Sequence, residues 1–127
     1  MAARSPFSGA KSSSDHGTVN PLEAFDALDL RVGRIVRAEP HPRARKPSYK
    51  LWIDFGPLGE KTSCAQITAG YRADQLTGKL VVAAVNLGQR NVAGFTSEVL
   101  VLGVPDAEGN TVLLAVDQEV PVGGKVY

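Results

Sequence analysis

The sequence has a single cysteine, Cys64, and only two histidines, His16 and His41. One thiol cannot form a disulfide within the chain or a cysteine-rich zinc site, and a lone cysteine is typical of a reducing compartment, which favours the cytoplasm. Two isolated histidines supply too few ligands for a metal centre. We therefore expect no cofactor. Cys64 should be a small buried or half-buried residue, and both histidines should lie at the surface.

Long apolar runs are also missing. No stretch is long enough to span a bilayer or to form the core of a signal peptide, so the sequence predicts neither membrane insertion nor export. Zinc-ligand spacings, phosphate-cradling glycine loops and serine nucleophile elbows are absent, and no acid, base and nucleophile stand at a workable spacing. These absences argue against an enzyme.

The chain has 127 residues, the usual size of one domain. Residues 1–20 are rich in serine and glycine and contain little that is apolar, which is typical of a solvated tail. The sequence therefore predicts one folded domain over residues 21–127.

The net charge of +1 conceals a segregation of charge along the chain. Residues 98–127 carry five acidic side chains and one basic one, a charge of −4. Residues 31–50 carry a charge of +6, because Glu39 is their only acidic residue. Such a cluster suits phosphates, but basic patches also occur on proteins without a charged ligand, so both interpretations stay open. The basic residues of the cluster are Arg31, Arg34, Arg37, Arg43, Arg45, Lys46 and Lys50.

A short helix is expected over residues 22–28, with Asn20 as its cap and Pro21 at its first position. Leu22, Phe25 and Leu28 form an apolar stripe on this helix. The stripe and residues 120–127 are the segments that either need a partner surface or pack on the chain's own barrel.

The segment 30–38 alternates between apolar and polar residues and shifts by one after Gly33, which predicts a strand with a bulge at that glycine. Residues 39–48 contain three prolines, so they form a loop that carries Arg43, Arg45 and Lys46. Residues 49–55 alternate again, which turns Trp52 outward. A large aromatic at the surface marks a contact site, or else a rim position covered by the N-terminal helix.

The rest of the chain predicts further strands over residues 61–67, 80–85, 95–103 and 111–116, one helical turn at 73–76, a loop at 86–94 and a turn at 106–110. This pattern is typical of an all-β OB fold. We expect a five-stranded Greek-key barrel with a short N-terminal helix and extra C-terminal strands. In that architecture the second and third strands and the first-second and fourth-fifth loops bind ligands.

Four blocks of sequence resemble the CsaA secretion chaperones of bacteria: Leu-Asp-Leu-Arg-Val-Gly-Arg-Ile from Leu28, Ala-Arg-Lys-Pro-Ser-Tyr-Lys-Leu-Trp-Ile-Asp-Phe-Gly from Ala44, Ala-Gln-Ile-Thr from Ala65, and Gly-Phe-Thr-Ser-Glu-Val-Leu-Val-Leu-Gly from Gly94. The resemblance runs from about Pro21 to Tyr127. It implies a homodimeric OB-fold protein that binds unfolded precursor proteins and assists export. It also implies kinship with the tRNA-binding domain appended to methionyl-tRNA synthetases.

Two functions follow. In a peptide-binding chaperone, Trp52 and Phe95 would line apolar pockets, and Lys50 and the basic loop would form an electrostatic rim. In a tRNA-binding protein, arginines and lysines would contact phosphates, and Asn86 and Ser97 would contact sugars or base edges. The candidate tRNA-binding residues are Arg43, Arg45, Lys46, Lys50, Asn86, Arg90, Ser97 and Glu98.

The chain departs from the tRNA-binding modules at two places. These modules tend to have a lysine soon after the leucine that corresponds to Leu87, where this chain has Gly88. They also tend to have a Gly-Met pair after the serine, where this chain has Glu98-Val99-Leu100. Both departures favour the chaperone as the function and leave tRNA binding as the alternative.

Overall fold

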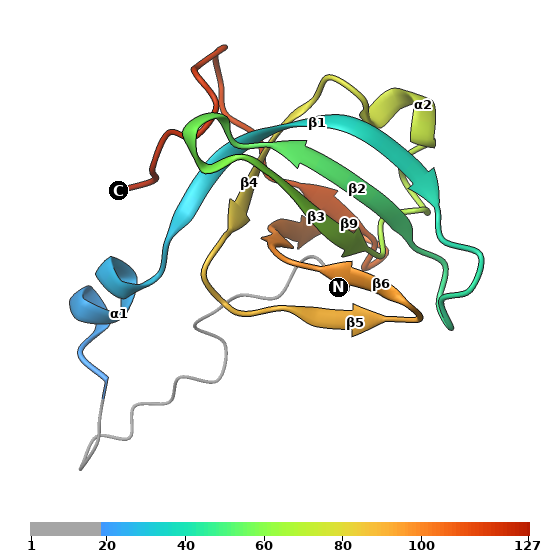
Figure 1. Ribbon diagram of the computed structural model, residues 1–127, viewed down its shortest axis with the longest axis horizontal. Helices are drawn as coiled ribbons and strands as arrows, with labels where there is room; N and C mark the ends of the chain where they lie inside the picture. The colour runs from blue at the N-terminus through green and yellow to red at the C-terminus, as the bar shows by residue number, and fades with distance from the viewer. Residues whose placement is uncertain (1–18) are drawn as a thin grey trace.

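The computed structural model describes residues 19–127, so His16 and most of the expected tail lie outside the described residues. The first element is the helix α1 (Pro21–Ala27), close to the expected bounds. The Asn20 side-chain oxygen accepts hydrogen bonds from the backbone N–H groups of Leu22 and Glu23 at 3.0 and 3.1 Å, which confirms the predicted cap. No residue of α1 is buried, and the helix projects from one side of the molecule (Figure 1).

The strands β1 (Leu30–Pro40), β2 (Tyr49–Asp54) and β3 (Glu60–Ala65) form an antiparallel meander. The chain then passes through the short helix α2 (Ala73–Leu76) to β4 (Leu80–Ala84), which pairs with the other edge of β1. The strand β7 (Leu100–Val101) pairs with β4 and completes the order β3-β2-β1-β4-β7. This is the Greek-key order of an OB fold, and the prediction of the fold is confirmed.

The barrel closes where the segment before β7 meets the free edge of β3. The backbone N–H groups of Glu98 and Val99 donate to the Thr62 carbonyl at 2.8 and 3.1 Å. The Ser63 hydroxyl donates to the Val99 carbonyl at 2.8 Å. Hydrogen bonds thus join the edge of β3 to the segment that leads into β7, which covers part of that edge.

The interior of the barrel is filled by the inward faces of the strands and by one residue from α2. The alternation predicted for β2 is confirmed, since Leu51 and Ile53 are fully buried while Trp52 is only half-buried. The buried cluster comprises Ile35, Tyr49, Leu51, Ile53, Phe55, Ala65, Ile67, Leu76, Val81, Ala83, Val99 and Val101.

The bulge predicted at Gly33 lies three residues further on. Gly33 pairs in regular register with Val81 of β4, whereas the pairing of β1 with β2 skips Val36. Gly33 has another role, because a Cβ atom there would lie 2.6 Å from both Ile53 Cγ2 and Phe55 Cε1. The glycine therefore permits close packing across the barrel, and the shift in hydrophobic pattern alone did not locate the bulge.

The region after β4 differs from the prediction in two ways. The loop expected at residues 86–94 contains a strand, β5 (Arg90–Val92), which pairs with β6 (Phe95–Ser97). The turn between them is Ala93-Gly94, which lacks the Asn-Gly or Asp-Gly signal of such hairpins, so the strand was missed. The single strand expected over 95–103 is divided among β6, β7 and β8 (Gly103–Pro105), because the chain changes pairing partners.

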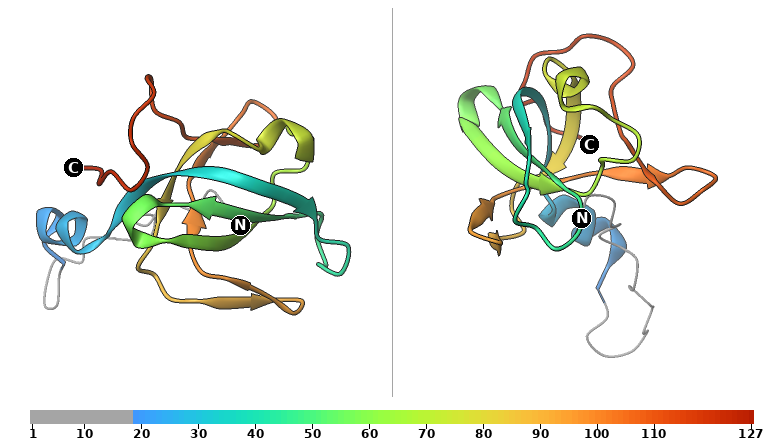
Figure 2. Two further views of the ribbon diagram at one scale, coloured as in Figure 1. Left: turned by 45° about the horizontal axis from the view of Figure 1, so that its top comes forward. Right: turned by 90° about the vertical axis from the view of Figure 1, so that its right-hand side faces the viewer.

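The extra C-terminal strands are present as β8 and β9 (Thr111–Leu113), with the expected turn at 106–110. Figure 2 shows that the β5–β6 hairpin lies on the same side of the barrel as β2 and β3, whereas the β8–β9 hairpin extends from the opposite side. Within residues 19–127, no helix has the length and apolar character needed to cross a membrane.

Candidate ligand-binding face

The outward face of β2 carries the expected aromatic residue, Trp52, packed against Phe95 from β6. Their ring centroids are 5.5 Å apart and their planes meet at 70°. This edge-to-face arrangement is the favoured contact of two aromatic rings, because the positive edge of one meets the negative face of the other. Phe95 also remains half-buried. The two rings predicted for peptide binding are therefore brought together.

Two cations cover these rings. The Arg37 guanidinium carbon lies 4.4 Å from the Trp52 ring centroid, and Lys50 Nζ lies 5.9 and 5.7 Å from the Trp52 and Phe95 centroids. All three distances allow cation–π attraction. Glu39 forms ion pairs with Arg37 and, at 3.8 Å, with Lys50, which holds the cations in place. We call Arg37, Lys50, Trp52 and Phe95 the aromatic platform.

His41 was expected at the surface, and this prediction is wrong. It is only 6% exposed, its Nε2 lies 2.7 Å from the Val92 carbonyl oxygen, and its ring meets Phe95 edge-on at 6.0 Å. The contact joins the loop after β1 to the β5–β6 hairpin. This contact could not be predicted from an isolated histidine in a proline-rich loop, because its partner is a backbone group far along the chain.

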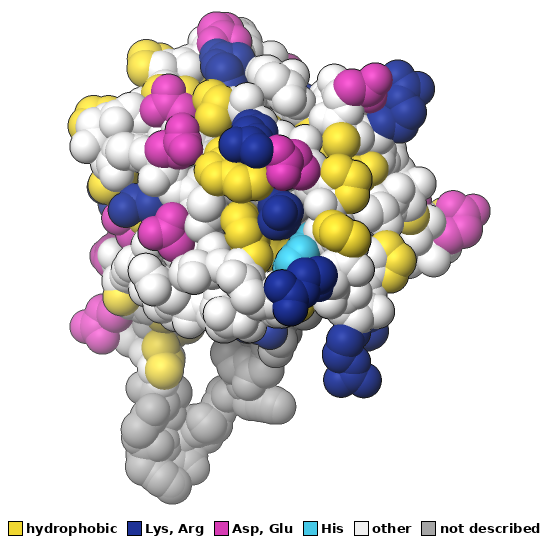
Figure 3. Space-filling view, turned by 45° about the vertical axis from the view of Figure 1, so that its right-hand side comes forward, with side chains coloured by type: hydrophobic (Ala, Val, Ile, Leu, Met, Phe, Trp, Pro, Cys, Tyr) yellow, Lys and Arg dark blue, Asp and Glu magenta, His cyan; other side chains and the backbone are white. Residues whose placement is uncertain are grey.

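The residues 41–48 form the basic loop expected from the prolines. Arg43, Arg45 and Lys46 are exposed and make no ion pair with another described residue. Arg43 Nη1 lies 4.0 Å from the position that a Cβ atom would take at Gly94, so the loop approaches the tip of the β5–β6 hairpin. Figure 3 shows basic and apolar side chains interleaved on this side of the molecule.

A pocket of about 260 Å³ lies between the β5–β6 hairpin and the end of β3, and we call it the hairpin pocket. Arg90 and Ser97, two of the predicted nucleic-acid contacts, line it together with apolar residues that the sequence did not single out. Leu87 is the most accessible of these, with 51% of its surface exposed. The full lining is Ser48, Cys64, Gln66, Leu87, Gly88, Arg90, Val92, Ser97, Val99 and Leu100.

Ser97 and Glu98 form hydrogen bonds with the backbone of β3. The Ser97 hydroxyl accepts a hydrogen bond from the Cys64 backbone N–H at 3.0 Å. Glu98 Oε1 accepts from the Thr62 backbone N–H at 2.9 Å. Cys64 is buried as predicted. A contact of Ser97 or Glu98 with nucleic acid stays a prediction, and it would compete with these internal bonds.

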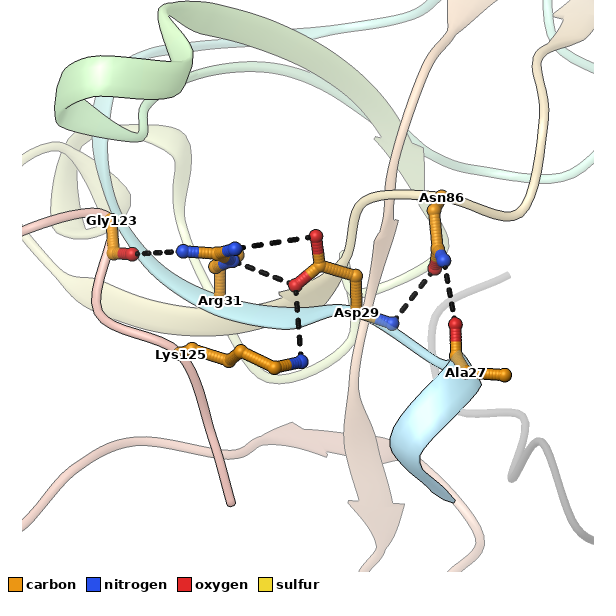
Figure 4. Close-up of polar contacts among 6 residues, drawn as sticks. All are labelled: Ala27, Asp29, Arg31, Asn86, Gly123 and Lys125. Carbon is orange, nitrogen blue, oxygen red and sulfur yellow. Dashed lines mark hydrogen bonds and ion pairs between the residues drawn. The ribbon is translucent and has the colours of Figure 1, made fainter. Parts of the chain in front are cut away.

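Asn86 is not among the lining residues of the hairpin pocket, although the next residue, Leu87, is. Asn86 lies where α1 meets β1 (Figure 4). Its side-chain oxygen accepts from the Asp29 backbone N–H at 2.9 Å, and its Nδ2 donates to the Ala27 carbonyl at 2.8 Å. Both ends of the amide are thus used to connect the end of β4 with the end of the helix. A nucleic-acid contact by Asn86 stays a prediction.

The neighbouring Asp29 carboxylate joins β1 to the C-terminal segment (Figure 4). Arg31 Nε donates to Asp29 Oδ1 at 2.7 Å, Arg31 Nη1 donates to the Gly123 carbonyl at 3.0 Å, and Lys125 Nζ lies 3.5 Å from Asp29 Oδ1. The hydrogen bond from Arg31 lowers the pKa of Asp29 below its ordinary value. Burial opposes the shift, and the charges of Arg31 and Lys125 add to it.

The sequence missed Arg37, Leu87 and Val92 as site residues. Leu87 and Val92 are apolar residues in a segment interpreted as a loop. Apolar residues in an exposed loop can indicate a binding surface, and this was the signal that could have identified them. Arg37 gave no separate signal, because its position over Trp52 depends on the register of β1 with β2.

The barrel, with the aromatic platform and two loops beside it, is an OB-fold module. Residues 30–125 match the family described as a putative tRNA-binding domain. A CsaA chaperone of Bacillus anthracis str. Ames is 47% identical with a TM-score of 0.77, over 86% of this chain and 99% of that one. A CsaA chaperone protein of Picrophilus torridus is 41% identical with a TM-score of 0.79, over 86% and 100%.

A methionine–tRNA ligase of Methanocaldococcus jannaschii is 37% identical over 105 residues. The match covers 83% of this chain and 16% of the ligase, so the chain spans only a small part of the length of such curated relatives. The chain belongs to the tRNA-binding-domain family and is of the CsaA type.

The Asp29 pairing predicts a pH-dependent difference in stability. Because its folded-state pKa lies below the unfolded value, the contribution of the carboxylate is present above about pH 4 and is lost as the pH falls through the folded-state pKa. At neutral pH, Asp29→Asn should lower the free energy of unfolding by about 1–2 kcal/mol. The difference from the wild-type protein should shrink below about pH 4, as measured by urea unfolding.

Asp26→Asn is the control for that experiment, because Asp26 is exposed on α1 and makes no ion pair with another described residue. It should change the stability at neutral pH by less than about 0.5 kcal/mol. Equal effects of the two substitutions at neutral pH would contradict the stabilising role of the Asp29 network.

Proposed function

We propose that this protein is a chaperone that binds unfolded precursor proteins in the cytoplasm, before their export, and acts by binding without catalysis. The observation that carries the proposal is the hairpin pocket, with Leu87, Val92, Val99 and Leu100 in its lining. Apolar side chains of an extended client can leave water there. The family and the CsaA-type relatives support the same function.

Electrostatics favour acidic or uncharged client segments. Arg90 lies in the lining of the hairpin pocket, and the exposed Arg43, Arg45 and Lys46 lie on the loop next to the hairpin tip. Such a rim accelerates the encounter with acidic segments more than it strengthens the final complex. Because an unfolded ligand loses conformational freedom on binding, we expect affinities of about micromolar or weaker.

We further propose that the protein is a homodimer. Leu22 on α1 is 70% exposed, although Phe25 and Leu28 of the same stripe are half-buried. Tyr127 at the C-terminus is also fully accessible. Exposed apolar residues on a projecting helix are typical of a surface that pairs with a second copy.

A second candidate function is tRNA binding, and the basic loop is the observation that favours it. Arg43, Arg45 and Lys46 are free of ion pairs with other described residues, so their charges are available for phosphates. The aromatic platform suits it less, because Arg37 already lies over the Trp52 ring on which a base would stack. The chaperone therefore remains our first choice.

The chaperone function predicts that Leu87→Ser weakens binding to an unfolded protein. The probe is reduced, carboxymethylated α-lactalbumin, which stays unfolded, and native α-lactalbumin is the negative control. Because the substitution removes apolar contact area from the hairpin pocket, affinity should fall about fivefold by fluorescence anisotropy. Val112→Ser, at a residue of β9 with 41% exposure, is the matched control and should bind normally. Unchanged binding by Leu87→Ser would remove the pocket from the client site.

The dimer proposal predicts that the wild-type protein has twice the mass of its chain by multi-angle light scattering. Leu22→Glu should yield monomers, since the interface would then bury a carboxylate from each protomer. Val104→Glu, at an exposed residue of β8, should remain dimeric. A wild-type monomer, or a Leu22→Glu dimer, would contradict the proposed surface.

The tRNA alternative predicts a steep fall in tRNA affinity with increasing salt. Replacing Arg45 and Lys46 by glutamate should weaken binding and reduce the slope of log affinity against log salt by about one per lost phosphate contact. Replacing Arg72 and Lys79 by glutamate makes the same change in net charge away from the basic loop and should leave the slope intact. An identical slope in the two double variants would exclude the loop as the binding site.

A further inference from the structure

The β5–β6 hairpin has one edge against the barrel and one edge without a neighbour. On the side of β6, the Thr62 hydroxyl of β3 donates to the Thr96 carbonyl at 2.6 Å. On the other side, β5 pairs with no further strand among residues 19–127. Unpaired edges of this kind are where an additional strand can join a sheet.

The register shows which backbone groups face this free edge. Val92 pairs with Phe95 across the turn Ala93-Gly94, in which both residues have positive φ values, 50° and 90°. The pair that closes a turn of this type exchanges hydrogen bonds, and the next pair does not. Asn91 and Thr96 form that next pair, so the N–H and C=O groups of Asn91 point outward from β5. The outward Thr96 carbonyl agrees with this assignment.

The side chains next to this edge lead into the hairpin pocket. Arg90 and Val92 flank Asn91 and both line the pocket, whereas the Asn91 side chain accepts a hydrogen bond from the Gly94 N–H at 3.0 Å. In a strand added antiparallel to β5, the residue opposite Asn91 would exchange two backbone hydrogen bonds with it. Because side chains alternate along a strand, the residues on either side of it would point toward the pocket.

We propose that an unfolded client binds as an extended strand on the free edge of β5, with apolar side chains two residues apart entering the hairpin pocket. This inference rests on the proposed chaperone function and specifies its binding mode. Backbone pairing is independent of client sequence, and the pocket requires only an apolar residue on each side of the paired one. The short length of β5 limits the number of bonds, which keeps binding weak and reversible.

The first test uses Asn91→Pro and its matched control, Asn91→Ala. Both variants lose the side-chain bond to Gly94, but only proline removes the outward backbone N–H. Proline is tolerated at an edge position whose N–H faces outward, and thermal unfolding verifies that both variants fold. Asn91→Pro should bind the carboxymethylated α-lactalbumin probe about three- to tenfold more weakly than Asn91→Ala.

The second test leaves the protein unchanged and modifies a peptide. The peptide is a serine-rich chain with an aspartate at each end and two central leucines separated by one serine, and it competes with the unfolded probe. N-methylation of the serine between the leucines should weaken competition about three- to tenfold, because that N–H pairs with Asn91. N-methylation of either leucine should have little effect, whereas replacing either leucine by serine should weaken competition.

The outcomes separate the two levels of the proposal. If the wild-type protein fails to bind the unfolded probe, the chaperone function and the strand addition are both wrong. If the probe binds but Asn91→Pro equals Asn91→Ala, or if N-methylation acts equally at all three positions, the strand addition alone is overturned. The strand addition is supported if N-methylation weakens competition only at the central serine and side-chain replacement weakens it at the two leucines.

Discussion

The strand β1 is the constraint on which the rest of the structure depends, because it is hydrogen-bonded along both edges. Its first half pairs with β4, and the Val32 and Leu30 backbone groups also bond the C-terminal segment through Gly123, Gly124 and Val126. Its second half pairs with β2. A strand that serves both sides of a small barrel must curve strongly. Gly33 permits this, because the Phe55 ring and the Ile53 Cγ2 methyl group next to it leave no room for a Cβ atom.

The bulge at Val36 connects this curvature to the candidate site. Ile35 pairs with Ile53 and Arg37 with Trp52, so β1 advances by two residues where β2 advances by one. In an unbroken register, Val36 would lie opposite Trp52. The extra residue instead places the guanidinium of Arg37 over the indole. Bulges commonly re-aim a side chain in this way. Here the same irregularity bends the barrel and builds the aromatic platform.

Features that depend on local pattern could be predicted from the sequence. Asn20 and Pro21 fixed the start of α1, and the alternation around Trp52 fixed which face of β2 turns outward. Features that depend on long-range partners could not. The contact of His41 with Val92 joins residues fifty-one positions apart. The β5–β6 hairpin has no strong turn signal, and it contacts the barrel through the hydrogen bond from Thr62 to Thr96. The architecture predicts that the first-second and fourth-fifth loops bind ligands, and this stays a prediction. The two loops lie near each other, since Arg43 Nη1 is 4.0 Å from the position that a Cβ atom would take at Gly94.

The distribution of internal hydrogen bonds bears on which ligand suits the face. Asn86 and Ser97 are the residues proposed for sugar or base contacts, and Glu98 belongs to the same candidate nucleic-acid set. Each of the three is engaged with the backbone of its own chain. Redirecting such a group to a ligand leaves its present partner unsatisfied, which costs about 1–3 kcal/mol where that partner is buried. Ligand binding over Leu87 and Val92 in the hairpin pocket has no comparable free-energy cost, because apolar side chains lose only contact with water when a ligand covers them. The exposed cations of the basic loop suit phosphates. The apolar surface of the hairpin pocket and the outward backbone of Asn91 suit an extended polypeptide better than a nucleotide.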